Sequence, residues 1–248
     1  QKVVYETALS LAREAAKGPK QVLIVEGGPG TGKSVVAVNL LVELTKEGVV
    51  AQYVSKNTAP RDVYTAKLSG SFRKSYINNL FVGSGSFIDT PPDTFGALIV
   101  DEAHRLNMKS GLYSNLGENQ IIEIIQASRF SVFFVDDRQQ VHIKDIGSKA
   151  AIQRFAESCG AVVHTAKLSS QFRCNGSYGY LSWLDNTLQI KETANIRLAA
   201  DDYDFQIFSD PNQLFETIKE KNKINNKARV VAGYCWHWNS KKNLNEYD

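Results

Sequence analysis

The stretch Gln21-Val-Leu-Ile-Val-Glu-Gly-Gly-Pro-Gly-Thr-Gly-Lys-Ser34 decides the fold. Its first six residues form an apolar run that is typical of a buried parallel strand, and the helical pattern of residues 33–47 follows the glycines. The segment between them matches G-x-x-x-x-G-K-[ST], the pattern of a loop that binds phosphate between a strand and a helix. The sequence therefore predicts a nucleotide site at residues 27–34.

The same alternation of apolar runs and helical stretches continues along the chain and predicts an α/β fold with a parallel sheet. Helical patterns cover residues 2–17, 33–47, 59–69, 119–128, 148–158, 177–189 and 211–223. Strand patterns cover residues 21–26, 49–54, 97–101, 131–135, 161–165, 204–208 and 228–234. The polar stretch 186–204 lacks a period, so we expect a first domain at 1–185, a linker at 186–204 and the beginning of a second domain at 205–248.

Composition excludes several classes of protein. Hydrophobic residues make up 43% and charged residues 22%, and no apolar run reaches the roughly 18 residues of a membrane span, so we expect no membrane partner. The net charge of +3 does not by itself identify a nucleic-acid binder. The three cysteines form no C-x-x-C pair, which favours a reducing, cytoplasmic compartment. Without an initial methionine, the chain is expected to be a piece of a longer protein, and its oligomeric state is left open.

The glycine-rich loop predicts how ATP and Mg²⁺ would be held. Backbone N–H groups of the loop and the start of the following helix would surround the phosphates. Lys33 would pair with the β and γ phosphates, and the hydroxyl of Ser34 would coordinate Mg²⁺, which prefers hard oxygen ligands. The residues expected to bind the nucleotide are Gly28, Pro29, Gly30, Thr31, Gly32, Lys33 and Ser34.

Two carboxylates follow a second apolar strand, in Ala97-Leu-Ile-Val-Asp-Glu-Ala-His104. They stand at the carboxyl end of the strand, where open α/β sheets bind their ligands. Asp101 is expected to join the Mg²⁺ site, and Glu102 to act as the general base that activates water, which favours hydrolysis. His104 either links this site to another motif or caps the turn that follows.

Two further polar groups complete the predicted site. Phe133-Phe-Val-Asp-Asp-Arg-Gln-Gln140 is another apolar strand with a polar end, and the amide of Gln140 is expected to contact the γ phosphate. Arg173, in Gln171-Phe-Arg173, is either a surface residue or, as the resemblance described below implies, an arginine that stabilises charge on the transferred phosphoryl group from across a cleft.

In their order, these blocks resemble the motifs of superfamily 1 DNA/RNA helicases, and most closely the Schlafen-type helicase domains of bacteria. By that resemblance Gln1 would read the adenine, and Tyr53 to Pro60 would be a motif whose members Ser55, Lys56, Asn57 and Thr58 contact a single strand. Residues 229–238, with Trp236 and Trp238, would form the first strand of a second motor domain. The sequence departs from the family at Asp136, where a glycine is usual.

The resemblance implies a RecA-like P-loop ATPase domain, followed by the start of a second RecA-like domain, in a motor on single-stranded DNA or RNA. Because the family's motifs V and VI do not occur before Asp248, the 248 residues alone are expected to bind Mg-ATP but hydrolyse it slowly. The alternative is a signalling switch or nucleotide-gated binding module without nucleic acid. A small-molecule kinase is disfavoured, since Glu102 favours water as the acceptor.

Overall fold

The structure, a computed structural model, describes residues 1–70, 73–111, 115–140, 142–170, 178–198 and 204–231. The chain divides into two compact units, Gln1–Leu181 and Ser182–Asp248. Within the described ranges, no helix combines the length and the apolar character needed to cross a bilayer.

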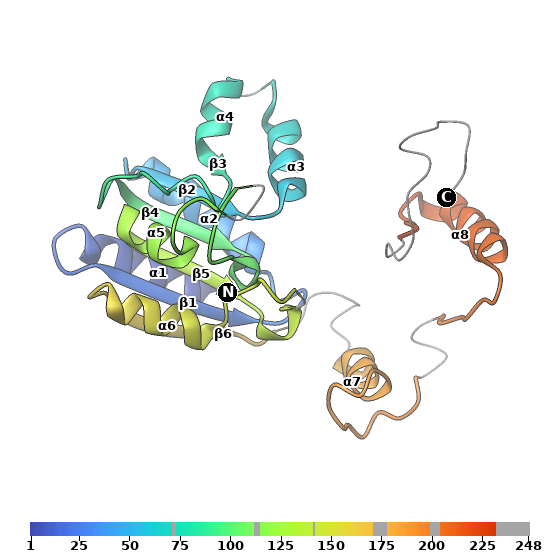
Figure 1. The fold of residues 1–248 in the computed structure, drawn as a ribbon. Coiled ribbons are helices and arrows are strands. Elements are labelled where there is room, and N and C mark those ends of the chain that lie inside the picture. Colours follow the sequence, from blue (N-terminus) through green and yellow to red (C-terminus); the bar gives the residue numbers. More distant parts are fainter. Residues whose placement is uncertain (71–72, 112–114, 141, 171–177, 199–203, 232–248) are drawn as a thin grey trace. The chain divides into compact units, whose positions relative to one another are not determined.

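A six-stranded parallel sheet forms the centre of the first unit (Figure 1). The strand order across it is β3-β2-β4-β5-β1-β6. The strands are β1 (Gln21–Gly27), β2 (Ala51–Ser55), β3 (Phe81–Val82), β4 (Phe95–Asp101), β5 (Ser128–Val135) and β6 (Val162–Leu168). With the glycine-rich loop directly after β1, this arrangement confirms the predicted α/β fold of the RecA-like P-loop class.

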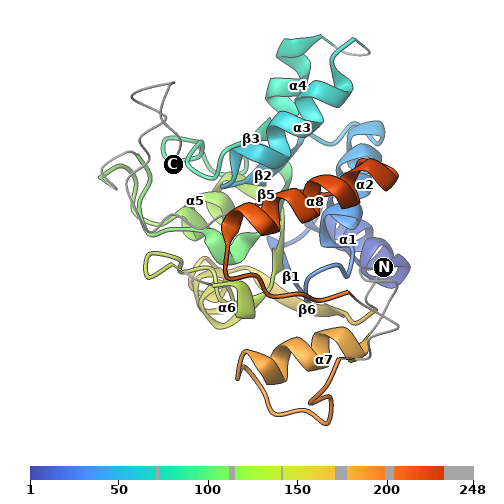
Figure 2. The same ribbon diagram turned by 90° about the vertical axis from the view of Figure 1, so that its right-hand side faces the viewer.

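Helices cover both faces of the sheet because alternate strand residues point to opposite sides. Leu23 and Val25 of β1 pack with α1 (Lys2–Ala15) and α2 (Lys33–Lys46). Val22 and Ile24 pack with α5 (Gln120–Ala127) and α6 (Lys149–Ser158) on the other face. Figure 2 shows the two helix pairs on opposite sides of the strands.

Short polar side chains begin the helices of the second face. The side-chain oxygen of Asn119 accepts hydrogen bonds from the backbone N–H groups of Ile121 and Ile122 at the start of α5. Ser148 accepts from the N–H of Ala151 at the start of α6. Such caps satisfy N–H groups that have no partner inside the helix, so these two residues determine where each helix begins.

Two further helices, α3 (Thr58–Leu68) and α4 (Lys74–Leu80), project from the edge of the sheet formed by β2 and β3 (Figures 1 and 2). We call residues 57–80 the α3–α4 lobe. The sequence did not predict α4 or β3, because both are short; α4 follows a stretch rich in serine and glycine, and β3 follows α4 directly. The lobe stands at the edge where the parallel strands end.

The second unit contains two described helical segments, α7 (Tyr178–Thr187), which begins in the first unit, and α8 (Pro211–Asn225). The strand predicted at residues 204–208 is wrong, since these residues have no regular structure and Ile207 is 86% exposed. An apolar run needs a neighbouring strand to pair with, and none is described in this unit. Residues 228–231 are also irregular, and the rest of the predicted strand, with Trp236 and Trp238, lies outside the described residues.

Candidate nucleotide site

The strand order brings three polar segments together at the carboxyl edge of the sheet. β5 lies between β1, which leads into the glycine-rich loop, and β4, which ends at Asp101. The residues after β5 therefore stand between the loop and the two carboxylates. Parallel strands end at one edge, so segments more than 100 residues apart in the chain share a site.

The glycine-rich loop adopts a conformation that other residues rarely reach. Gly30 and Gly32 have φ of 73° and 87°, in the left-handed region that glycine enters without steric cost. The loop is held from within, because the carbonyl of Gly28 accepts hydrogen bonds from the Thr31 hydroxyl at 2.9 Å and from Lys33 Nζ at 3.1 Å. Gly28 and Thr31 thus shape the loop without lining the cleft.

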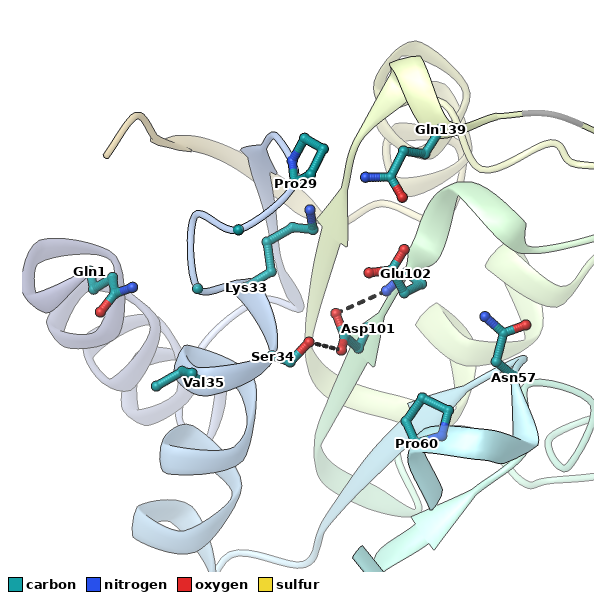
Figure 3. Close-up of a pocket in the computed structure, with 12 residues that line it drawn as sticks. Gln1, Pro29, Lys33, Ser34, Val35, Asn57, Pro60, Asp101, Glu102 and Gln139 are labelled. Atoms are coloured by element: carbon teal, nitrogen blue, oxygen red, sulfur yellow. Dashed lines mark hydrogen bonds between the residues drawn. The ribbon is translucent and has the colours of Figure 1, made fainter. Parts of the chain in front are cut away.

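A cleft of about 750 Å³ opens beside the loop (Figure 3). A pocket of this volume is within the range that encloses small ligands. Its lining residues come from α1, the loop, α2, α3, the end of β4 and the segment after β5: Gln1, Pro29, Gly30, Gly32, Lys33, Ser34, Val35, Asn57, Pro60, Asp101, Glu102 and Gln139.

Asp101 is the most enclosed acid of the cleft, with 3% of its surface exposed. Its Oδ2 accepts hydrogen bonds from the Ser34 hydroxyl at 2.6 Å and from the Tyr53 hydroxyl at 2.5 Å. Its Oδ1 accepts from the backbone N–H of Glu102 at 3.0 Å. Burial raises the pKa of the Asp101 carboxyl, and the hydrogen bonds from Ser34 and Tyr53 partly oppose that rise.

The pair of Ser34 and Asp101 fits a magnesium ion. A hydroxyl and a carboxylate whose oxygens lie 2.6 Å apart offer two hard oxygen ligands beside the loop. Mg²⁺ commonly takes one or two protein oxygens and completes its octahedron with water and phosphate oxygens. Within the described residues no cluster of three or more histidine, cysteine or acidic side chains could hold a metal alone.

We expect Asp101→Asn to raise the stability of the metal-free protein at neutral pH. A raised pKa means that the ionised carboxyl is less favourable in the folded than in the unfolded chain, so its contribution to stability is lost as pH rises through the folded pKa. The neutral amide removes this cost, and each kcal/mol gained adds about 2–4 °C to Tm. Thermal unfolding from pH 3 to 8 should show the two proteins diverging as pH rises; equal Tm values at pH 7 would contradict the prediction.

Tyr53 is a member of the site that the sequence analysis did not single out. The strand register pairs Ser55 with Asp101, and Tyr53 shares the face of β2 on which Ser55 lies. The hydroxyl reaches the carboxylate while the ring packs against Tyr64 and Phe81, with centroids 5.7 and 5.5 Å away. Burial and the charge of Asp101 raise the pKa of Tyr53, so its hydroxyl stays a donor at neutral pH.

Tyr53→Phe should lower the free energy of unfolding by about 1.5–3 kcal/mol at pH 7, the usual contribution of a hydrogen bond to a charged group. The ring contacts are kept, so the change isolates the hydroxyl. Denaturant unfolding provides the measurement, and the same substitution in an Asp101→Asn background serves as the control. A loss of the same size in both backgrounds would show that the bond to the carboxylate is not the cause.

Glu102 turns its side chain into the cleft through an unusual backbone conformation. Its φ of 52° lies in the left-handed region, where a residue with a side chain is strained. Figure 3 shows its carboxylate on the same side as that of Asp101, although neighbouring strand residues would point apart. The turn therefore allows both acids to face one ligand.

His104 links Glu102 to the segment after β5, which decides between the two roles left open for it. The ring is 1% exposed, and its Nδ1 accepts the backbone N–H of Asp136 at 3.3 Å. The neutral ring then carries its proton on Nε2, which lies 3.1 Å from Glu102 Oε2. His104 thus holds the Glu102 carboxylate in place.

The structure places Gln139, not Gln140, in the cleft. The amide of Gln139 donates to Asp136 Oδ2 at 2.8 Å. The amide of Gln140 donates to the carbonyl of Asp145 instead, outside the lining of the cleft. The turn that places Gln139 in the cleft begins at Asp136. Its φ of −141° is a conformation that any residue adopts, so this position does not require a glycine, and its carboxylate caps the short 3-10 helix Asp137–Gln139.

The four residues predicted to contact a single strand separate into two groups. Ser55 is 1% exposed, and Lys56 Nζ is held by Asn107 Oδ1 at 3.0 Å and by the buried Asp145 Oδ1 at 3.3 Å. Asn57 and Thr58 are exposed at the start of α3. Of the four residues, only Asn57 and Thr58 are exposed.

Gln1 lies against the glycine-rich loop. Its amide donates to the carbonyl of Thr31 at 2.9 Å, and a Cβ on Gly32 would meet that amide at 1.9 Å. Gly32 therefore permits both the loop conformation and the approach of Gln1. Arg173 lies outside the described residues.

A protein-family comparison matches most of the chain. The family described as Schlafen group 3, DNA/RNA helicase domain, matches residues 20–248. A Saccharomyces cerevisiae protein described as "Uncharacterized protein YPL245W" is 25% identical over 251 residues, which cover 85% of this chain and 54% of that protein. The chain therefore spans about half the length of this curated relative.

The chain is also similar, at low sequence identity, to parts of solved structures. The Pyrococcus furiosus Hef helicase domain is 11% identical, with a TM-score of 0.38 over 67% of this chain and 38% of that one. AMPPCP-bound DnaA from Aquifex aeolicus is 16% identical, with a TM-score of 0.35 over 91% of this chain and 64% of that one.

Proposed function

The chain belongs to the Schlafen group 3 DNA/RNA helicase-domain family, and on that premise we propose that it is the ATP-binding and ATP-hydrolysing part of a motor that moves on single-stranded DNA or RNA. The motor would follow the superfamily 1 pattern. One observation carries the proposal: Lys33, Ser34, Asp101, Glu102 and Gln139 line a single cleft of about 750 Å³.

In the proposed binding mode, the triphosphate lies along the loop. Lys33 Nζ, which donates to the carbonyls of Gly27 at 2.7 Å and Gly28 at 3.1 Å, would move to the β and γ phosphates. Gln1 lies at the end of the cleft opposite Gln139, where it would contact the base. Ser34 and Asp101 would hold Mg²⁺, and the ion would supply positive charge that stabilises the phosphates during hydrolysis.

Hydrolysis would begin with a water held by Glu102. One carboxylate oxygen accepts the proton of that water, whose oxygen attacks the γ phosphorus while the bond to the β-phosphate oxygen breaks and ADP leaves. His104 holds the other side of the carboxylate, as its Nε2 lies 3.1 Å from Oε2. The amide of Gln139 would contact the γ phosphate, the role expected of Gln140, and Arg173 remains the proposed arginine from across the cleft.

The rate of ATP hydrolysis with and without a single-stranded oligonucleotide tests the proposal. The protein should be the natural one that contains this chain. We expect stimulation by DNA or by RNA, because a motor couples hydrolysis to movement along the strand. Hydrolysis that is unaffected by any oligonucleotide would contradict the motor and favour a nucleotide-gated switch.

A further inference from the structure

The α3–α4 lobe carries a net positive charge. Residues 57–80 contain Arg61, Lys67, Arg73 and Lys74 against the single acid Asp62, a net charge of +3 in a unit of 181 residues. Several acids of the other segments pair with cations. The pairs include Lys20 with Asp93, Lys149 with Glu26 and Arg13 with Glu47.

Three cations of the lobe have no such partner. Lys67, Arg73 and Lys74 are exposed, and no ion pair or hydrogen bond of their side chains occurs within the described ranges. Exposed like charges on neighbouring helices repel each other, so these three cations do not stabilise the fold of the lobe. A ligand that carries several negative charges would relieve this repulsion.

The lobe is anchored at its base and free at its tip. α3 has no fully buried residue, and α4 has only Ile77. At the base, Tyr64 stacks on Phe81 with ring centroids 5.1 Å apart, and both rings contact Tyr53. The helices therefore stand on an aromatic base and project from the sheet (Figures 1 and 2).

We propose that the exposed face of the α3–α4 lobe binds the phosphates of single-stranded nucleic acid through Lys67, Arg73 and Lys74. The inference rests on the proposed motor function and names the surface for its strand. It shifts the contacts away from Ser55, which is buried, and Lys56, whose ammonium group is held by Asp145 and Asn107.

The position of the lobe suits a strand that controls hydrolysis. Asn57 and Pro60, at the start of α3, line the nucleotide cleft. At the base of the lobe, the Tyr53 hydroxyl holds the Asp101 carboxylate. A strand bound to α3 and α4 thus lies on two helices, of which α3 lines the cleft at one end. Through Tyr64, α3 also packs against Tyr53 of β2, which holds the Asp101 carboxylate.

Binding of labelled single-stranded DNA and RNA oligonucleotides, measured by fluorescence anisotropy at several salt concentrations without ATP, tests this surface. The variant replaces Lys67, Arg73 and Lys74 with glutamine. Three lost phosphate contacts should reduce the slope of log K against log[salt] by about 2, at about 0.7 per contact for single strands. Basal ATP hydrolysis without oligonucleotide should not change, because none of the three residues lines the cleft.

The matched control replaces the exposed Lys17, Lys46 and Arg154 with glutamine. It removes the same charge from sites outside the lobe: after α1, at the end of α2 and in α6. Its affinity and salt slope should remain close to those of the wild type. Equal weakening in both variants, or an unchanged slope in the lobe variant, would overturn the inference while leaving the motor intact. A wild-type protein that binds neither DNA nor RNA would instead contradict the proposed function itself.

Discussion

Glu102→Gln is expected to lower the rate of ATP hydrolysis about 10²–10⁴-fold, the usual contribution of a general base. The amide has nearly the shape of the carboxylate, and its oxygen can still accept a hydrogen bond from His104 Nε2, now 3.1 Å from the acid. It cannot take a proton from water. Ser34 and Asp101 are unchanged, so the affinity for Mg-ATP should stay close to that of the wild type.

Phosphate release under saturating ATP measures the rate, and a fluorescent ATP analogue measures the affinity. The matched control is Glu26→Gln: this acid lies near the end of the parallel strand β1 but pairs with Lys149 at 2.5 Å and does not line the cleft. Its rate should stay near that of the wild type. A Glu102→Gln protein that hydrolyses ATP within about threefold of the wild type would mean that another group activates the water.

Lys33→Met should weaken ATP binding about 10- to 150-fold, which corresponds to the roughly 1.5–3 kcal/mol of a hydrogen bond to a charged group. Methionine keeps the length of the side chain but removes the ammonium group. In the structure Lys33 is 6% exposed, and among the described residues its ammonium group donates to the carbonyls of Gly27 and Gly28. Hydrolysis should fall as well, because the γ phosphate loses its positive neighbour.

The fold of the Lys33→Met protein should survive, since the substitution replaces a buried cation with an apolar group of similar volume. A Tm at or above that of the wild type would therefore separate lost binding from unfolding. Lys46→Met, on the same helix α2 and 68% exposed, is the control and should bind ATP normally. Normal ATP affinity in Lys33→Met would show that the loop does not hold the phosphates.

Much of the fold could be predicted because its signals are local. The apolar run at residues 21–26 and the glycine-rich loop after it predicted β1 and the start of α2 within a residue or two. The apolar runs before Asp101 and Asp136 likewise predicted β4 and β5, although both strands begin earlier than expected. Where a strand needs a partner, as at residues 204–208, local pattern was misleading.

Asp101 and Glu102 show the limit of reading a site from its motif. The sequence predicted that these acids stand at the end of a buried strand, and neighbouring strand residues ordinarily point to opposite faces. The left-handed turn at Glu102, with φ 52°, brings both carboxylates to one cleft. Beside that turn, His104 contacts both Glu102 and the backbone N–H of Asp136, a residue far away in the sequence.

The sequence by itself determined the chemical groups at the sheet edge: a glycine-rich loop, a lysine and a serine at the start of α2, and two acids at the end of β4. The tertiary structure alone decided that Gln139 rather than Gln140 faces the cleft, that Tyr53 holds Asp101, and that Lys56 pairs with Asp145. The reason is physical. A strand or loop pattern depends on neighbours in the chain, whereas the direction of a side chain at a turn and the partner of a charge depend on segments folded against it from far away.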